Sequence, residues 1–176
     1  MGDIVNKPYI YFNRLGIPDP NGPLEGGAGV WLVKREDDKI SILFQKRSEN
    51  VQNGGFYDAS AGGHIDEGED SLSAALRETR EEIGLELSPE ELSFVCTYAT
   101  DKKYISVYIS DRTGKDDVLT LNKEEVELVE WITLEEFDMF VRARVKPPLR
   151  ELVPHLPVLR YYIEHYLYNE DNQSQI

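Results

Sequence analysis

The sequence lacks the features that stabilise secreted proteins or anchor proteins in membranes. It has a single cysteine, Cys96, so no disulfide can form within the chain, which fits a reducing compartment. No apolar run approaches the about 18 residues that a membrane-spanning helix needs. The segment MGDIVNKPYIYF lacks the basic-then-apolar order of a signal peptide. We therefore expect a cytoplasmic protein without a membrane partner.

Basic residues are also scarce. The chain has 19 Lys and Arg against 33 Asp and Glu, and its formal net charge is −14. Proteins that hold nucleic acid nonspecifically use Lys and Arg to neutralise phosphates, so we expect no nucleic-acid partner. A phosphorylated substrate fits this charge if cations bridge it to the protein.

Apolar patterns and turn residues predict strands and helices in mixed order. Strands are expected at 28–34, 40–47, 92–100, 104–110 and 126–132, and the segment 56–65 is expected to be a short strand that enters a Gly-rich bend. Helices are expected at 70–83, at 134–144 with Thr133 as the cap, and at 149–168. This order lacks the regular strand–helix–strand repetition of a parallel sheet. It predicts an α+β fold, in which a mixed sheet is packed between helices as an α/β/α sandwich.

Composition divides the chain into four parts. We expect an N-terminal arm at 1–24, one domain at 25–148, a C-terminal helix that packs on it at 149–169, and a flexible tail at 170–176. The aromatic run YYIEHYLY in the third part would face the core or an oligomer surface, which leaves a homodimer open.

The helix predicted at 70–83 carries acidic residues at its unfavourable end. Glu81 and Glu82 fall in the last turn before Gly84, where the helix dipole destabilises an exposed carboxylate by about 0.3–1 kcal/mol. Glu78 adds repulsion at spacings of three and four residues. A solvated acidic face would not explain why the charges gather at this end.

At about 100° per residue, these three glutamates share one flank of the helix. Arg77 and Arg80 project to other sides. The buried stripe is predicted to be Leu72, Leu76, Thr79 and Ile83.

A divalent cation would explain the acidic cluster. Mg²⁺, or Mn²⁺ in its place, binds through carboxylates, waters and phosphate oxygens, so repulsion between the acids becomes ligation. Gly62 and Gly63 allow a tight bend just before the helix, where a backbone group can approach metal or phosphate.

The spacing of these residues resembles the signature of the Nudix hydrolases, G-x5-E-x7-R-E-U-x-E-E-x-G-U with U aliphatic. The segment 63–85 matches at every fixed position, namely Gly63, Glu69, Arg77, Glu78, Glu81, Glu82 and Gly84. Thr79 at the first aliphatic position is the one departure. The resemblance extends over about residues 25 to 140 and implies a Nudix-type sheet.

The resemblance also implies roles for the residues of the signature. Metal ligands would be Glu78, Glu82, Glu81 and a backbone group of Gly62. Glu81 or Glu78 would act as general base, Arg77 would orient a glutamate of the signature, and Glu69, Gly63 and Gly84 would shape the loop and the helix end. Glu125 stands where many members have an additional acid, as ligand or base; an exposed loop charge is the alternative.

Substrate contacts are expected from residues upstream of the signature. Arg47 can bind a phosphate bidentately, although a surface charge is the alternative. Tyr57 and Phe56 could stack on a nucleobase, or pack in the core. His64 would at most position the backbone.

The implied activity is a divalent-metal-dependent pyrophosphohydrolase. Water activated by the metal would attack a diphosphate linkage in a small, nucleotide-derived substrate, without a covalent intermediate. The stretch GGFYDASAGGH is similar to the branch with isopentenyl diphosphate isomerases, which makes isomerase the alternative, but Gly62 stands where their cysteine should be. A non-catalytic nucleotide-sensing module is a further alternative, although such modules typically lose acids that this chain retains.

Overall fold

The structure is a computed structural model that describes residues 25–99, 103–145 and 155–168. The predicted arm and tail lie outside the described residues. The strands are β1 (Glu25–Glu36), β2 (Lys39–Arg47), β3 (Tyr57–Asp58), β4 (Ala61–His64), β5 (Ser93–Ala99), β6 (Lys103–Asp111) and β7 (Val126–Thr133). The helices are α1 (Ser71–Ile83), α2 (Phe137–Arg144) and α4 (His155–Tyr162), with short turns η1 (Pro89–Glu91) and η2 (Ile163–Leu167).

The seven strands form one mixed sheet in the order β3-β2-β1-β6-β5, while β4 pairs with β1 and β7 pairs with β2. Strand β1 runs parallel to β6 and antiparallel to β2 and β4. Its first half pairs with β4, where Gly29 lies opposite Gly62, and its second half pairs with β2, where Val33 lies opposite Ile42. The glycine bend that precedes α1 is therefore fixed beside the central strand.

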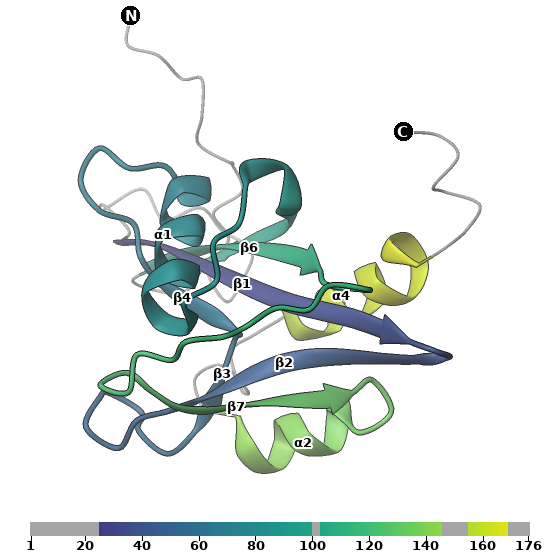
Figure 1. The fold of residues 1–176 in the computed structure, drawn as a ribbon. Helices are drawn as coiled ribbons and strands as arrows, with labels where there is room; N and C mark the ends of the chain where they lie inside the picture. The colour runs from purple at the N-terminus through teal and green to yellow at the C-terminus, as the bar shows by residue number, and fades with distance from the viewer. Residues whose placement is uncertain (1–24, 100–102, 146–154, 169–176) are drawn as a thin grey trace, which may run out of the picture.

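Helices cover both faces of this sheet (Figure 1). One hydrophobic cluster joins the sheet to α2 and α4 through Phe137, Val141 and Leu159. The other cluster joins the opposite face to α1 through Ala75 and Ile83. The predicted α+β fold with a mixed sheet between helices is confirmed.

Several predicted boundaries were wrong, and local contacts explain two of them. The segment 56–65, expected to be one short strand and a Gly-rich bend, contains two strands, β3 and β4, because the side chain of buried Ser60 bridges β1 and β2 between them. Its hydroxyl donates to the carbonyl of Leu43 (2.6 Å) and accepts from the amide of Leu32 (2.8 Å). Helix α2 begins at Phe137 instead of directly after Thr133, its predicted cap, because residues 134–136 form a turn in which the amide of Glu136 donates to the carbonyl of Thr133 (3.0 Å).

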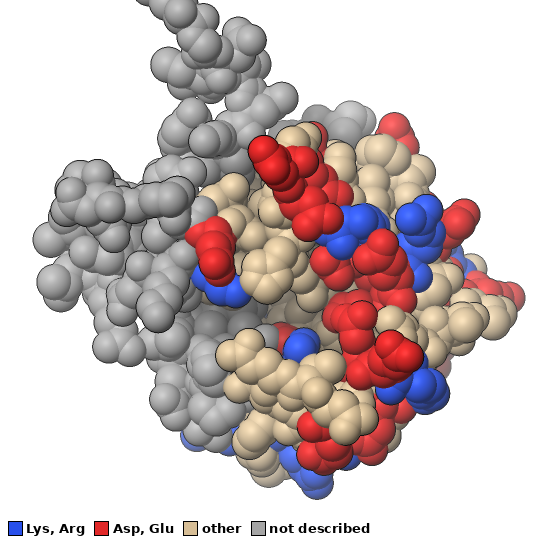
Figure 2. All heavy atoms as spheres, turned by 90° about the vertical axis from the view of Figure 1, so that its left-hand side faces the viewer, with Lys and Arg blue, Asp and Glu red and all other residues tan. Residues whose placement is uncertain are grey.

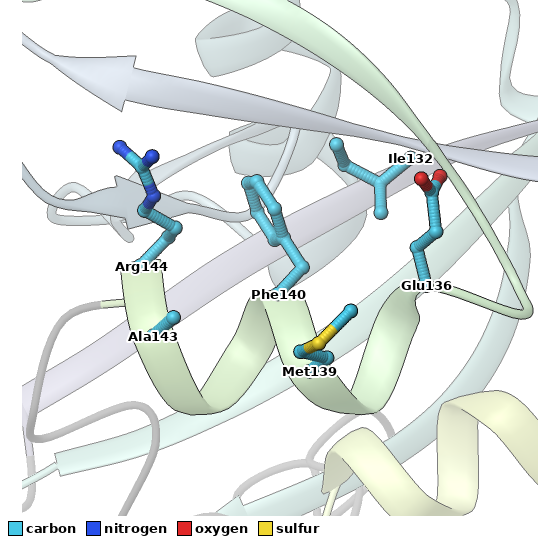
Figure 3. A pocket seen from close by; sticks show the side chains of 6 residues that line it. All are labelled: Ile132, Glu136, Met139, Phe140, Ala143 and Arg144. Atoms are coloured by element: carbon cyan, nitrogen blue, oxygen red, sulfur yellow. The ribbon is translucent and has the colours of Figure 1, made fainter.

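Two further features bear on function. None of the described helices is long and apolar enough to span a membrane. A pocket of about 230 Å³ opens between β7 and α2, on the face of the sheet that α1 does not cover (Figure 3). It is lined by Ile132, Glu136, Met139, Phe140, Ala143 and Arg144, and none of the site residues predicted from the sequence is among them.

Candidate functional site

Helix α1 has the ends that its sequence predicts. Asp70 caps the first turn, where its carboxylate accepts from the amide of Ser73 (2.7 Å). Gly84 ends the helix in the left-handed conformation, with φ of 68°, and its amide donates to the carbonyl of Arg80 (3.0 Å). The three glutamates therefore occupy the last two turns.

The loop before β7 neutralises the carbonyl end of α1. The amides of Thr120 and Asn122 donate to the carbonyls of Ile83 and Glu82, each at 2.9 Å. The same loop positions Glu125, whose Oε1 accepts from Nδ2 of Asn122 (3.1 Å). Part of the unfavourable dipole at this end is thus satisfied by backbone donors.

Glu82 is not on an exposed flank, because it is taken into the core. Its exposed fraction is 3%, and its Oε2 accepts from the amide of Gly62 (2.8 Å) and from Nε2 of Gln45 (3.0 Å). The predicted buried stripe was therefore wrong in part: Leu72 and Leu76 are only half-buried. The buried residues are Ala74, Ala75, Thr79, Glu82 and Ile83.

Burial changes the acidity of the cluster. Desolvation raises the pKa of Glu82 to about 8, and the charges of Glu78 and Asp58 act in the same direction. The hydrogen bonds from Gly62 and Gln45 oppose this rise. Desolvation also raises the pKa of Glu78, against the effect of its guanidinium partner.

Arg77 connects the acids of the signature. It donates to both carboxylate oxygens of Glu69 (3.0 and 3.1 Å), to Glu78 (2.7 Å) and to Glu81 (3.2 Å), and its NH2 also donates to the carbonyl of His64 (2.8 Å). The expectation that Arg77 projects away from the glutamates was wrong, because its long side chain folds back across the helix. Its guanidinium lowers the pKa of Glu69.

The glycine before the loop gives Glu78 its place. A β-carbon at Gly63 would overlap the Glu78 carboxylate, so the bend and the acid are packed against each other. Gly62 is also closely approached, since a β-carbon there would lie 2.7 Å from the carbonyl oxygen of Ala28. Glu81 is the most exposed of the three helix acids, with 48% of its side chain accessible.

Two polar residues of this site, Gln45 and Asp58, were not predicted from the sequence. Gln45 and Asp58 are cross-strand partners in β2 and β3, so their side chains project to the same face. Both are buried, and Asp58 Oδ2 lies 3.5 Å from NH1 of Arg47. The only available signal was polarity inside strands: Gln45 follows the apolar run ISILF, and Asp58 lies in FYDASA.

Among the predicted substrate contacts, Arg47 lies at this site and Tyr57 lies in the core. Arg47 also donates from Nε to the carbonyl of Gln52 (2.9 Å), so Asp58 and Gln52 hold it in place. Tyr57 is buried, packs edge-to-face on Phe140 and donates its hydroxyl to Glu130, which favours the core-packing alternative. Phe56 is exposed.

Cys96 lies apart from the glycine bend. It is on β5 and packs against the cluster that contains α2 and α4, whereas Gly62 is on β4 beside α1. Burial raises the pKa of the Cys96 thiol to about 11. A thiol in this place gives the isomerase alternative no support.

The donor set fits a hard divalent cation by its chemistry. Acidic side chains gather on the face that carries α1 and border a hollow there (Figure 2). The acids of α1 offer carboxylate oxygens, the ligands that Mg²⁺ and Mn²⁺ prefer, and the charges of Glu78, Glu81 and Glu82 are close enough to perturb one another. Within the described ranges, no group of three Asp, Glu, His or Cys side chains already converges as a metal site. Arg77 holds Glu78 and Glu81 in this arrangement.

Comparison with known proteins identifies the family and the fold. A family model described as NUDIX domain matches residues 23–156. An uncharacterised Nudix hydrolase of Clostridium acetobutylicum is 30% identical over 126 residues, which are 65% of this chain and 60% of that protein. An RNA pyrophosphohydrolase of Pelagibacter ubique is 27% identical over 157 residues, which are 76% of this chain and 96% of that protein.

The fold also matches a solved structure. The Ap4A hydrolase of C. elegans, in a binary complex, superimposes with a TM-score of 0.59 at 20% identity, over 82% of this chain and 98% of that chain. This likeness concerns the fold. The Clostridium protein is longer than the matched region, since the match spans 60% of its length.

Proposed function

Because the chain belongs to the NUDIX-domain family, we propose that it is a hydrolase that breaks a diphosphate linkage in a small, nucleotide-derived substrate. The observation that carries this proposal is the joint placement of the signature acids. Glu82 is buried under the glycine bend, Glu78 lies against Gly63, and Arg77 ties Glu78 to Glu69 and Glu81.

Glu78 and Glu82 are the proposed ligands of a divalent cation, with Glu81 and a backbone group of Gly62 as further candidates. Such a cation, when bound, polarises phosphoryl oxygens, lowers the pKa of water and neutralises the leaving phosphate. Mg²⁺ is the proposed ion and Mn²⁺ its substitute. Arg77 keeps the acids in place, and Arg47 beside Asp58 is the proposed phosphate contact.

The proposed reaction is a direct displacement by water. A water oxygen forms a bond to phosphorus, the bridging P–O bond breaks, and the bridging oxygen leaves with the other phosphate. The water proton goes to a carboxylate, for which exposed Glu81 is the first candidate, with Glu78 and Glu125 as alternatives. No covalent enzyme intermediate is required.

The charge of the protein favours a small substrate. The net charge of −14 and the acidic face repel long polyanions, which favours small diphosphates. Relatives point in two directions, since one is named RNA pyrophosphohydrolase and another Ap4A hydrolase. A cytoplasmic location and a homodimer remain predictions.

A hydrolysis screen tests this proposal. The purified protein is incubated with nucleoside di- and triphosphates, nucleotide sugars, dinucleotides and a 5′-triphosphorylated RNA, with Mg²⁺, Mn²⁺ or chelator, and products are identified by mass. We expect cation-dependent cleavage of a small diphosphate and none of the RNA. Binding without turnover would favour a sensing module, and conversion of isopentenyl to dimethylallyl diphosphate would favour the isomerase.

The site of attack can be read from isotope incorporation. Hydrolysis in ¹⁸O-labelled water should place the label in one phosphate product within a single turnover. Isolation of a phosphoryl- or nucleotidyl-enzyme would contradict direct displacement, even if the substrate class were correct.

A further inference from the structure

Gln45 is a buried amide that is aimed at an acid of the signature. It lies on β2 with an exposed fraction of 1%, and its Nε2 donates to Oε2 of Glu82 at 3.0 Å. The two residues are 37 positions apart in the chain, and Gln45 lies outside the segment 63–85. The contact therefore depends on how the sheet packs against α1.

Stability does not account for this amide. Oε1 of Gln45 is the one fully buried side-chain polar atom without a hydrogen bond among the residues that the structure describes. An unpaired buried acceptor destabilises a fold, and an apolar side chain of the same length would remove the penalty. A residue that breaks a packing rule in this way is expected to serve a site.

The contact fixes one oxygen of the Glu82 carboxylate. Oε2 accepts two donors from two different strands, the amide of Gly62 in β4 at 2.8 Å and Nε2 of Gln45 in β2. No described residue donates a hydrogen bond to Oε1 of Glu82. This oxygen is not fully buried, since Oε1 of Gln45 is the one fully buried side-chain polar atom without a partner among the described residues. The two donors thus set the rotation of the carboxylate and leave Oε1 open.

We propose that Gln45 is a positioning residue, which holds Glu82 so that Oε1 is the oxygen presented to the divalent cation. The proposal rests on the cation site of the proposed function and is independent of which diphosphate is cleaved. Hydrogen-bond partners that orient a ligand typically change metal affinity or activity by about 10- to 100-fold when removed.

Two substitutions that conserve length separate positioning from packing. Gln45→Met removes the donor and the unpaired acceptor, while Gln45→Glu places an acceptor opposite Glu82. Lys39→Met is the control, because Lys39 is an exposed residue of the same strand, β2. Mn²⁺ affinity of the metal-free full-length protein is measured by electron paramagnetic resonance titration, with thermal melting in parallel.

We expect Gln45→Met to weaken Mn²⁺ binding by about 10-fold or more, while the melting temperature of the metal-free protein is unchanged or higher. Gln45→Glu should weaken Mn²⁺ binding as well. If the Met variant does not fold, the Mn²⁺ affinity of Gln45→Glu tests the positioning role of Gln45. The control should match the unsubstituted protein in both measurements.

Mn²⁺ affinity within twofold of the unsubstituted protein in both variants would overturn the proposal, as would failure of the unsubstituted protein to bind Mn²⁺. Failure of the hydrolase proposal is distinguishable from this. A protein whose Mn²⁺ affinity depends on Gln45 and Glu82, but which cleaves no diphosphate, would refute the hydrolase and support the role of Gln45.

Discussion

The carboxylate of Glu78 lies against the α-carbon of Gly63, in the space that a β-carbon would fill. The absence of a β-carbon at Gly63 therefore allows the Glu78 carboxylate to occupy this position. The same acid is held from the other side by Arg77, at 2.7 Å. Glycine is needed at this position for close approach, since no positive φ is recorded for Gly63.

Gly63→Ala should therefore displace Glu78 without unfolding the protein. The overlapping atoms belong to the end of a flexible side chain, which can turn away from Arg77. We expect activity to fall by about 10- to 100-fold and the melting temperature to change little. Gly29→Ala is the control, because a β-carbon there meets no atom within 4 Å. Equal activity of the two variants would contradict the packing argument.

Removing the charge of Glu78 or Glu82 should separate activity from stability. We expect Glu78→Gln and Glu82→Gln to lose most of the cation-dependent hydrolysis, because each removes a proposed ligand. The metal-free protein should keep or gain stability, since like charges are relieved. Glu86→Gln, an exposed acid just beyond the helix, is the control. A loss of several kcal/mol in urea unfolding would indicate a structural ion pair instead.

Stability of the metal-free protein should fall as the pH rises from about 4.5 to about 8. The ordinary pKa of a glutamate is 4.5 and that of Glu82 is raised to about 8, so between these values the folded state binds more protons than the unfolded state. Each unit of difference corresponds to about 1.4 kcal/mol, which gives an effect on the order of a few kcal/mol. The raised pKa of Glu78 acts in the same direction.

Thermal melting of the chelated protein at several pH values checks this slope, and Glu82→Gln should flatten it. Acids with a lowered pKa do not contribute to the dependence of melting temperature on pH in this window. Glu69 and Glu91, the latter with a pKa of about 2, change stability below this window. Melting that is independent of pH between about 5 and 8 would show that Glu82 is ionised in the folded protein.

Arg77→Lys should destabilise the protein although the charge is kept. A lysine cannot reproduce the paired contacts to Glu69 together with those to Glu78. We expect the free energy of unfolding to fall by about 1–3 kcal/mol, which urea denaturation measures. Arg80→Lys, at an exposed position of the same helix, should change it by less than about 0.5 kcal/mol.

How much the sequence predicts depends on the range of the interactions. The ends of α1 follow from Asp70 and Gly84, because caps are made by residues next to the helix. The family signature likewise lies within one segment, and it predicts which acids gather at one helix end.

The burial of Glu82 could not be predicted in this way. A helical wheel shows which residues share a flank of the helix. It does not show which hydrogen-bond donors a neighbouring strand places beside that flank. Gln45 donates to Glu82 from β2, and this contact requires the register of β2 against α1. Asp58 was missed for the same reason, since only strand pairing places it beside Gln45.

Glu125 is either an additional acid of the site or an exposed loop charge, and its backbone contacts favour the first role. Its backbone is fixed on both sides: its carbonyl accepts from the amide of Ser48 (2.8 Å), and its amide donates to the carbonyl of Asn122 (3.0 Å). Asn122 is in turn bound to the last turn of α1 through the carbonyl of Glu82. The charge of Glu125 contributes to the raised pKa of Glu78, so the two acids face a common region.

An acid held in this way should act in the reaction more than in stability. We expect Glu125→Gln to lower kcat by about 10-fold or more, as loss of a general base or a ligand does, and to change the free energy of unfolding by less than about 0.5 kcal/mol. Glu124→Gln is the matched control, since Glu124 is the exposed neighbour on the same loop. If both variants keep the activity of the unsubstituted protein, Glu125 is a surface charge. If only Glu125→Gln loses activity, and Asn122→Ala loses it in part, the loop before β7 supplies the site with an acid that lies outside the signature.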